Sequence, residues 1–112
     1  MSAITLHATH AETSSGMGNS MSPATNTLIG MFINVSAVSG VLPTLIVKLQ
    51  ESPNGTDWYD VSGMVNGNAL AVTGLTSISA QSNQLIADNV RLVWTIGGVN
   101  PSFTFEVELE TL

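Results

Sequence analysis

Two segments of this chain, residues 38–49 and 96–107, carry nearly the same pattern of glycine, proline and alternating apolar residues. The first reads Val-Ser-Gly-Val-Leu-Pro-Thr-Leu-Ile-Val-Lys-Leu and the second Ile-Gly-Gly-Val-Asn-Pro-Ser-Phe-Thr-Phe-Glu-Val. Glycine accepts a positive φ, and proline begins a strand at a place where no ladder donor is needed. Each copy therefore predicts a strand, a turn and a second strand, and we expect two matching hairpins packed face to face.

The strands before the two turns match less well than the strands after them. The second copy has an inward-facing apolar series before its turn, at Val90, Leu92, Trp94 and Ile96. The first copy has its apolar series one residue out of step, at Met31, Ile33, Val35 and Ala37. Either a β-bulge shifts the parity of the first strand, or that strand is buried on both faces.

Alternation of apolar and polar residues with a period of two recurs along most of the chain, as is typical of strands. It is found in residues 3–9, 27–38, 42–51, 58–61, 69–78, 84–96 and 102–110. No segment has a helical period, and the many Gly, Ser, Thr and Asn residues disfavour helix. We predict an all-β fold, a two-layer antiparallel β-sandwich of immunoglobulin-like or jelly-roll-like type with about seven strands.

Residues 12–25 interrupt the alternation with a stretch rich in Gly, Ser and Asn. A loop of this length is uncommon inside a compact domain, and it is either functional or a simple flexible connection. We divide the chain into residues 1–25, an N-terminal strand and long arm that a partner could order, and residues 26–112, the sandwich core. The side chains that we expect to contact a partner are Ile4, Leu6, His7, His10, Met17 and Met21.

Charged residues make up only 9% of the chain, against roughly 25% in ordinary globular proteins. The net charge is −6, and Lys48 and Arg91 are the two permanent cations, which argues against binding to nucleic acid or an anionic membrane. No apolar run has the length of a membrane span, and the N-terminus lacks the features of a signal peptide. A surface poor in charge is cheaply desolvated, which suits burial by neighbouring proteins.

The sequence offers few groups for chemistry. His7 and His10 with Glu12 could be imagined as a metal site, but strand positions three apart point to opposite faces. Asp57 and Asp60 are better explained as a turn residue and an exposed strand residue than as an acid–base pair. No nucleophile elbow or phosphate-binding loop is present. We therefore predict that the protein is not an enzyme and needs no cofactor.

Two further features each leave alternatives open. Trp58 and Tyr59 would stack on a sugar if both were exposed, so a carbohydrate-binding module is an alternative function, whereas Trp94 belongs to an inward series. An acidic row faces outward on the last strand, at Glu106, Glu108 and Glu110. This row either protects a solvated edge strand from edge-to-edge pairing or complements a basic partner surface.

Two segments resemble parts of small β-sandwich virion proteins of tailed bacteriophages. Residues 49–61 read Leu-Gln-Glu-Ser-Pro-Asn-Gly-Thr-Asp-Trp-Tyr-Asp-Val, and residues 90–107 contain the second copy of the repeat. The resemblance implies a capsid decoration protein, often a homotrimer, which would be made in the host cytoplasm and bind the major capsid protein at the capsid surface. A tail accessory protein is the alternative within this group. The resemblance carries no catalytic residues.

Overall fold

The structure, a computed structural model, describes residues 2–23, 27–66, 70–79 and 87–111. These residues form six strands and no helix: β1 (Ser2–Glu12), β2 (Gly16–Met17), β3 (Leu28–Ser52), β4 (Tyr59–Val65), β5 (Gly74–Ser79) and β6 (Asn89–Thr111). Every pairing between these strands is antiparallel. The predicted all-β antiparallel class is confirmed. The described part of the chain contains no helix with the length and hydrophobicity needed to cross a bilayer.

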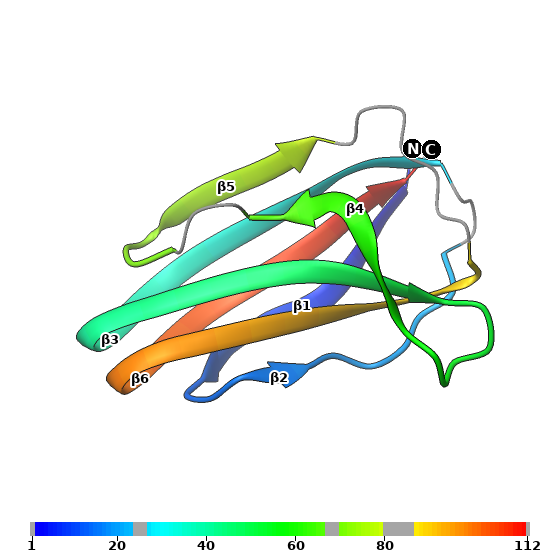
Figure 1. Ribbon diagram of the computed structural model, residues 1–112. Coiled ribbons are helices and arrows are strands. Elements are labelled where there is room, and N and C mark those ends of the chain that lie inside the picture. Colours follow the sequence, from blue (N-terminus) through cyan, green and yellow to red (C-terminus); the bar gives the residue numbers. More distant parts are fainter. Residues whose placement is uncertain (1, 24–26, 67–69, 80–86, 112) are drawn as a thin grey trace.

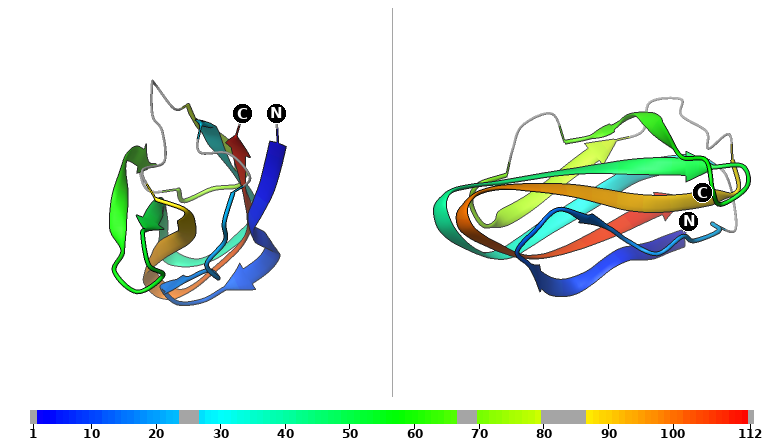
Figure 2. Two further views of the ribbon diagram at one scale, coloured as in Figure 1. Left: turned by 90° about the vertical axis from the view of Figure 1, so that its right-hand side faces the viewer. Right: turned by 60° about the horizontal axis from the view of Figure 1, so that its bottom comes forward.

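The six strands belong to one hydrogen-bonded sheet, whereas the sequence predicted about seven strands in two separate layers. The main order is β1-β6-β3-β4, with β2 also paired to β6 and β5 also paired to β3 (Figure 1). The strand count is lower because β3 and β6 are single long strands that pair along their whole length, from Leu28 opposite Thr111 to Ser52 opposite Asn89. This ribbon folds over midway, so that its two ends lie across a shared core (Figure 2).

The fold of the ribbon divides the sheet into two parts. The first half-sheet contains residues 28–39 of β3 and 102–111 of β6, flanked by β5 and β1. The second half-sheet contains residues 44–52 of β3 and 89–97 of β6, flanked by β4 and β2. Both parts supply the fully buried apolar side chains, which include Met31, Ile33, Leu45, Val47, Leu49, Val90, Leu92, Phe103, Phe105, Val107 and Leu109.

The two repeated segments form the corner where the ribbon folds, and the hairpin prediction is wrong. Each segment lies inside one continuous strand, and the two copies pair with each other: Val41 lies opposite Val99, and Thr44 lies opposite Gly97. The repeat therefore corresponds to two equivalent bends that lie side by side, and not to two separate hairpins.

The glycines of the repeat make this corner possible. Gly40 and Gly98 have φ values of +113° and +112°. A Cβ atom on Gly40 would lie 2.8 Å from the Cα atom of Pro101, and one on Gly98 would lie 2.9 Å from the Cα atom of Pro43. Each glycine thus leaves room for the proline of the other copy. Both the positive φ and the close approach of two backbones require glycine here.

The mismatch of parity before the two bends is explained by a β-bulge in β3. Val35 lies opposite Phe105 and Ala37 lies opposite Thr104, so Ser36 is an extra residue in the part of β3 that precedes the first copy. Of the two explanations that the sequence left open, the bulge is confirmed.

The N-terminal region lies along β6 in the isolated chain. β1 pairs with the C-terminal half of β6, β2 pairs with Trp94 and Val93, and an isolated bridge joins Met21 to Val90. Residues 24–26, at the predicted boundary between arm and core, lie outside the described residues. The ordering of residues 1–25 by a partner stays a prediction.

Candidate functional site

The six predicted contact residues lie in three different environments. Leu6 and His7 are buried in the domain, and Ile4 and Met21 are half-buried against its core. His10 and Met17 are exposed. Within the isolated chain, His10 and Met17 are therefore the members of the set that a partner could reach without any rearrangement.

His7 fastens β1 to the core. Its ring stacks on Phe105 with centroids 4.0 Å apart, and its edge-on contact with Trp94 has a centroid distance of 5.0 Å. The Nδ1 atom donates to the carbonyl oxygen of Phe105 at 3.0 Å, because a carbonyl can only accept. The burial of this histidine was not predictable from the alternation, which places His7 on the polar side of residues 3–9.

His7 and His10 approach the same carboxylate, although the sequence predicted opposite faces. The Nε2 atom of His7 lies 3.2 Å from Glu12 Oε1, and that of His10 lies 3.9 Å from it. Register shifts on both sides of His7 break the strict alternation of β1. Among the residues that the structure describes, no group of three or more His, Cys, Asp or Glu side chains could hold a metal ion.

The loop after β1 is held on β6 by contacts that the sequence did not reveal. The indole Nε1 of Trp94 donates to the Ser14 carbonyl at 3.0 Å, and the Ile96 amide donates to Ser15 Oγ at 2.9 Å. A Cβ atom on Gly16 would lie 2.9 Å from the Trp94 ring. The loop therefore packs closely against the ring of this tryptophan.

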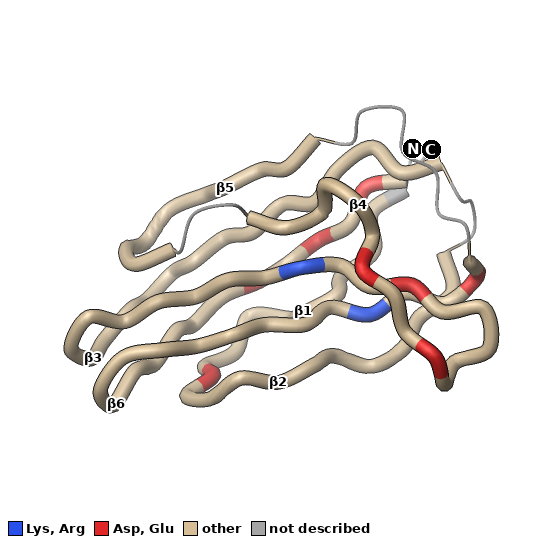
Figure 3. Tube along the Cα trace, viewed as in Figure 1, with Lys and Arg blue, Asp and Glu red and all other residues tan. Residues whose placement is uncertain are grey.

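Both permanent cations lie on the second half-sheet, as Figure 3 shows, and each has a partner there. The Nζ atom of Lys48 lies 3.1 Å from Asp60 Oδ1, and the guanidinium of Arg91 lies 4.3 Å from the centroid of the Trp58 ring. Gln50 links the two, because it donates to Asp60 and accepts from Arg91 Nε, each at 2.9 Å. The hydrogen bond from Gln50, followed by that from Lys48, lowers the pKa of Asp60.

The acidic row on β6 lies in the first half-sheet, away from both cations. It consists of Glu106, Glu108 and Glu110, all half-buried. The edge-strand interpretation is wrong, because β6 is paired on both sides: Glu108 lies opposite Thr5 of β1 and Phe32 of β3. The row therefore crosses the middle of the outer surface of the sheet, where the other interpretation, complementarity to a basic surface, still applies.

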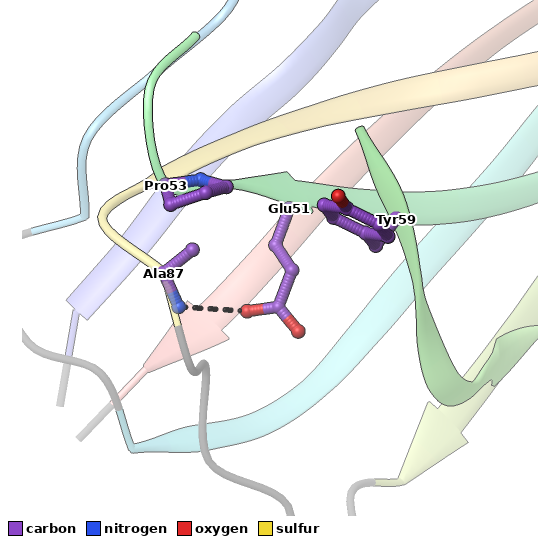
Figure 4. Close-up of a pocket in the computed structure, with 4 residues that line it drawn as sticks. All are labelled: Glu51, Pro53, Tyr59 and Ala87. Atoms are coloured by element: carbon purple, nitrogen blue, oxygen red, sulfur yellow. Dashed lines mark hydrogen bonds between the residues drawn. The ribbon is translucent and has the colours of Figure 1, made fainter. Parts of the chain in front are cut away.

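A small open pocket lies at the end of the second half-sheet. It is lined by Glu51 and Pro53 at the end of β3, Tyr59 of β4 and Ala87 ahead of β6 (Figure 4). Its volume is about 220 Å³ and its walls are almost entirely apolar. The buried Glu51 carboxylate accepts a hydrogen bond from the Ala87 amide at 2.9 Å, which fixes one wall of the pocket.

The two aromatic residues of the predicted sugar platform do not share one open surface. Trp58 is half-buried and the Arg91 guanidinium covers its ring, whereas Tyr59 is exposed beside the pocket. Trp94 is buried, as its inward series predicted.

Comparisons with known proteins identify the fold. No protein-family model and no curated protein matches this sequence. The structure is similar to the crystal structure of SPBc2 prophage-derived protein YomS, with a TM-score of 0.51 and 13% sequence identity. The match covers 96% of this chain and 90% of that one. At this identity the likeness shows that the two chains share a fold along nearly their whole lengths.

Proposed function

We propose that this chain is a structural virion protein of a tailed bacteriophage, namely a capsid decoration protein that binds the outer surface of the head. The observation that carries the proposal is the fold shared with a prophage-derived protein over 96% of this chain. The Ser-Pro-Asn-Gly-Thr-Asp-Trp-Tyr turn between β3 and β4 supports it, since the sequence there resembles phage virion proteins. The partner is the major capsid protein, and the chain acts as a homotrimer without enzymatic activity.

The acidic row of the first half-sheet is the surface that suits attachment to a shell. Glu106, Glu108 and Glu110 lie in the middle of the sheet, and both permanent cations lie on the other half-sheet. Such a row is attracted by a basic patch and repelled by other copies in the same orientation, which favours contact with a different protein. A shell repeats the patch many times, so weak contacts made by an oligomer add through avidity.

Co-sedimentation with phage heads tests the proposal. Purified protein is mixed with heads that lack it and, in parallel, with purified tails of the same phage. We expect it to sediment with heads, and binding to weaken as salt is raised, because the contact is electrostatic. Sedimentation with tails alone would make it a tail accessory protein, and sedimentation with neither would overturn the virion role.

A triple variant with Glu106→Gln, Glu108→Gln and Glu110→Gln tests the docking surface. It removes three charges from one surface while leaving the shape nearly unchanged, so head binding should fall at least tenfold. The control is Asp57→Asn with Asp88→Asn, which removes exposed charges outside the row. Head binding that is lost equally in both variants would show that net charge, rather than this row, matters.

A carbohydrate-binding module remains the second candidate because Tyr59 is exposed beside an apolar pocket. Its support is weaker, since the Arg91 guanidinium already covers the Trp58 ring. A glycan array separates the two functions. If the wild type binds a glycan and Tyr59→Ala does not, the carbohydrate-binding function is favoured. If the wild type binds no glycan on the array, that function is excluded.

A further inference from the structure

The corner of the folded ribbon ends in an exposed apolar tip formed by Val41, Leu42 and Val99. Leu42 is the most exposed of the three, at 84%. No charged residue lies within residues 38–44 or 96–102, the two segments that build the corner. An apolar group that protrudes from the chain contributes little to the chain's own core, so its contribution lies in contacts outside it.

Leu42 is also held in an unfavourable backbone conformation. Its φ is +49°, in the left-handed region, and the equivalent residue of the other copy, Asn100, has a φ of +48°. Asparagine is enriched in this region, whereas leucine is uncommon there. The chain therefore has asparagine at one bend and the less suitable leucine at the other. A strained residue that is almost fully exposed points to a functional contact.

The pocket lined by Glu51, Pro53, Tyr59 and Ala87 lies at the opposite end of the same molecule. Figures 1 and 2 show the corner at one end of the long axis and the turn that follows β3 at the other. The molecule is 39 Å long along this axis. Leu42 therefore cannot reach the pocket of its own chain, but a second copy can present its Leu42 there.

The pocket suits a side chain better than a ligand molecule. Its volume of about 220 Å³ is below the roughly 300–1,000 Å³ of pockets that hold drug-sized ligands. A cavity of about 150 Å³ holds benzene, so a leucine side chain with four carbon atoms fits with room to spare. Its walls are apolar, and the buried Glu51 carboxylate is already bonded to the Ala87 amide.

We propose that two copies of this chain associate head to tail, with Leu42 at the corner of one copy inserted into the Glu51–Pro53–Tyr59–Ala87 pocket of the next. Such a contact uses different surfaces on the two copies, so it closes into a ring when the rotation between copies permits. One contact is small and weak, and ring closure strengthens it through effective concentration. The contact goes beyond the virion role and stands whether or not the chain binds a phage head.

Cysteine cross-linking tests the contact, because the chain has no cysteine of its own. Val41→Cys places a thiol beside Leu42, and Pro53→Cys places one at the pocket. We expect oxidation of the mixture to give a disulfide-linked dimer that neither variant forms alone. A mixture of Val41→Cys with Val72→Cys is the control, since Val72 is exposed but outside the pocket.

Adding Leu42→Asn to the Val41→Cys variant should reduce the cross-link at least tenfold. If Val41→Cys does not fold, as judged by thermal melting, Val99→Cys replaces it on the same tip. The proposal is overturned if the mixture gives no more dimer than the single variants. It is also overturned if Val41→Cys cross-links mainly to itself, or if Leu42→Asn leaves the cross-link unchanged. Head binding is measured separately, by co-sedimentation, so the two proposals can fail independently.

Discussion

The two copies of the repeat have the same backbone conformation at the bend and differ in some of their side chains. Their glycines have φ values of +113° and +112°, and the residues two positions later have +49° and +48°. Three differences stand out: the extra residue Ser36 just before the first copy, the pair Leu42 and Asn100, and the pair Lys48 and Glu106. The common features are those that the corner requires. The features that differ are not required by the corner, so those positions can serve the packing of the core or contacts with partners.

The largest effect should come from deleting Ser36, the extra residue in the part of β3 that precedes the first copy. The deletion moves Met31, Ile33 and Val35 to the outer side of β3, because side chains alternate along a strand. Exposing three large apolar side chains costs on the order of 5 kcal/mol, comparable with the whole stability of a small domain. We expect the variant not to fold, as measured by circular dichroism.

Ser36→Ala is the matched control for this deletion. It keeps the extra residue and loses only the exposed hydrogen bond from Ser36 Oγ to the Thr104 carbonyl, at 3.3 Å. The free energy of unfolding should fall by less than about 1 kcal/mol. A deletion variant that melts like Ser36→Ala would mean that the bulge does not set the register of β3.

The glycines at the two bends should respond equally to substitution. Gly40→Ala and Gly98→Ala each combine a strained φ with a Cβ atom placed 2.8 Å from backbone atoms of the other copy. Each should lower the free energy of unfolding by about 3 kcal/mol in urea titrations. Gly55→Ala, where φ is +76° and nothing lies within 4 Å, should cost only about 1 kcal/mol. Unequal losses of stability at Gly40 and Gly98 would show that the two bends are not equivalent.

Exchanging the residues with left-handed backbone should change stability in opposite directions. Leu42→Asn should raise the free energy of unfolding by about 0.5–1 kcal/mol, and Asn100→Leu should lower it by a similar amount. Both are measured by urea unfolding of dilute protein, because self-association would add to the apparent stability. A loss of stability in Leu42→Asn would mean that the leucine supports the chain's own fold.

The smallest effect should come from Gln50, an outward residue of β3 after the first bend. Gln50 and Lys48 lower the pKa of Asp60. Because the pKa is lower in the folded state, this interaction stabilises the fold above the unfolded pKa and is lost as pH falls through the folded pKa. Gln50→Ala should raise the pKa of Asp60 towards its ordinary value in an NMR titration. An unchanged pKa would mean that Gln50 does not hold the carboxylate in solution.

Local patterns in the sequence predicted the parts of the fold that depend on local chemistry. Alternation located the strands and the buried Trp94, and the parity mismatch pointed to a bulge as one of two explanations. The pattern Gly-Val-x-Pro predicted a turn between two strands, whereas the structure has a bend within each long strand. It could not predict which strands pair, because a bend within a strand and a hairpin turn need the same positive φ. Pairing between β3 and β6 joins residues far apart in the sequence.

The candidate surfaces were less predictable than the fold. His7 falls on the polar side of the alternation in residues 3–9, but register shifts in β1 turn its ring onto Phe105. The exposure of Leu42 and the pocket beside Tyr59 depend on the tertiary arrangement at the two ends of the molecule. Local patterns in the sequence hold no information about that arrangement. The acidic row was visible in the sequence. Its place in the middle of the sheet followed only from the pairing of β6 on both sides.

The central claim is that the corner is required by the fold, whereas Leu42 on it serves a partner. The most direct measurement is the mass of wild type and Leu42→Asn in concentrated solution, by sedimentation, beside the melting temperature of each. The account predicts that the wild type associates, and that Leu42→Asn has the mass of a monomer and a melting temperature no lower than that of wild type when both are dilute. An unchanged mass in Leu42→Asn, or a monomer that melts well below the wild type, would contradict it.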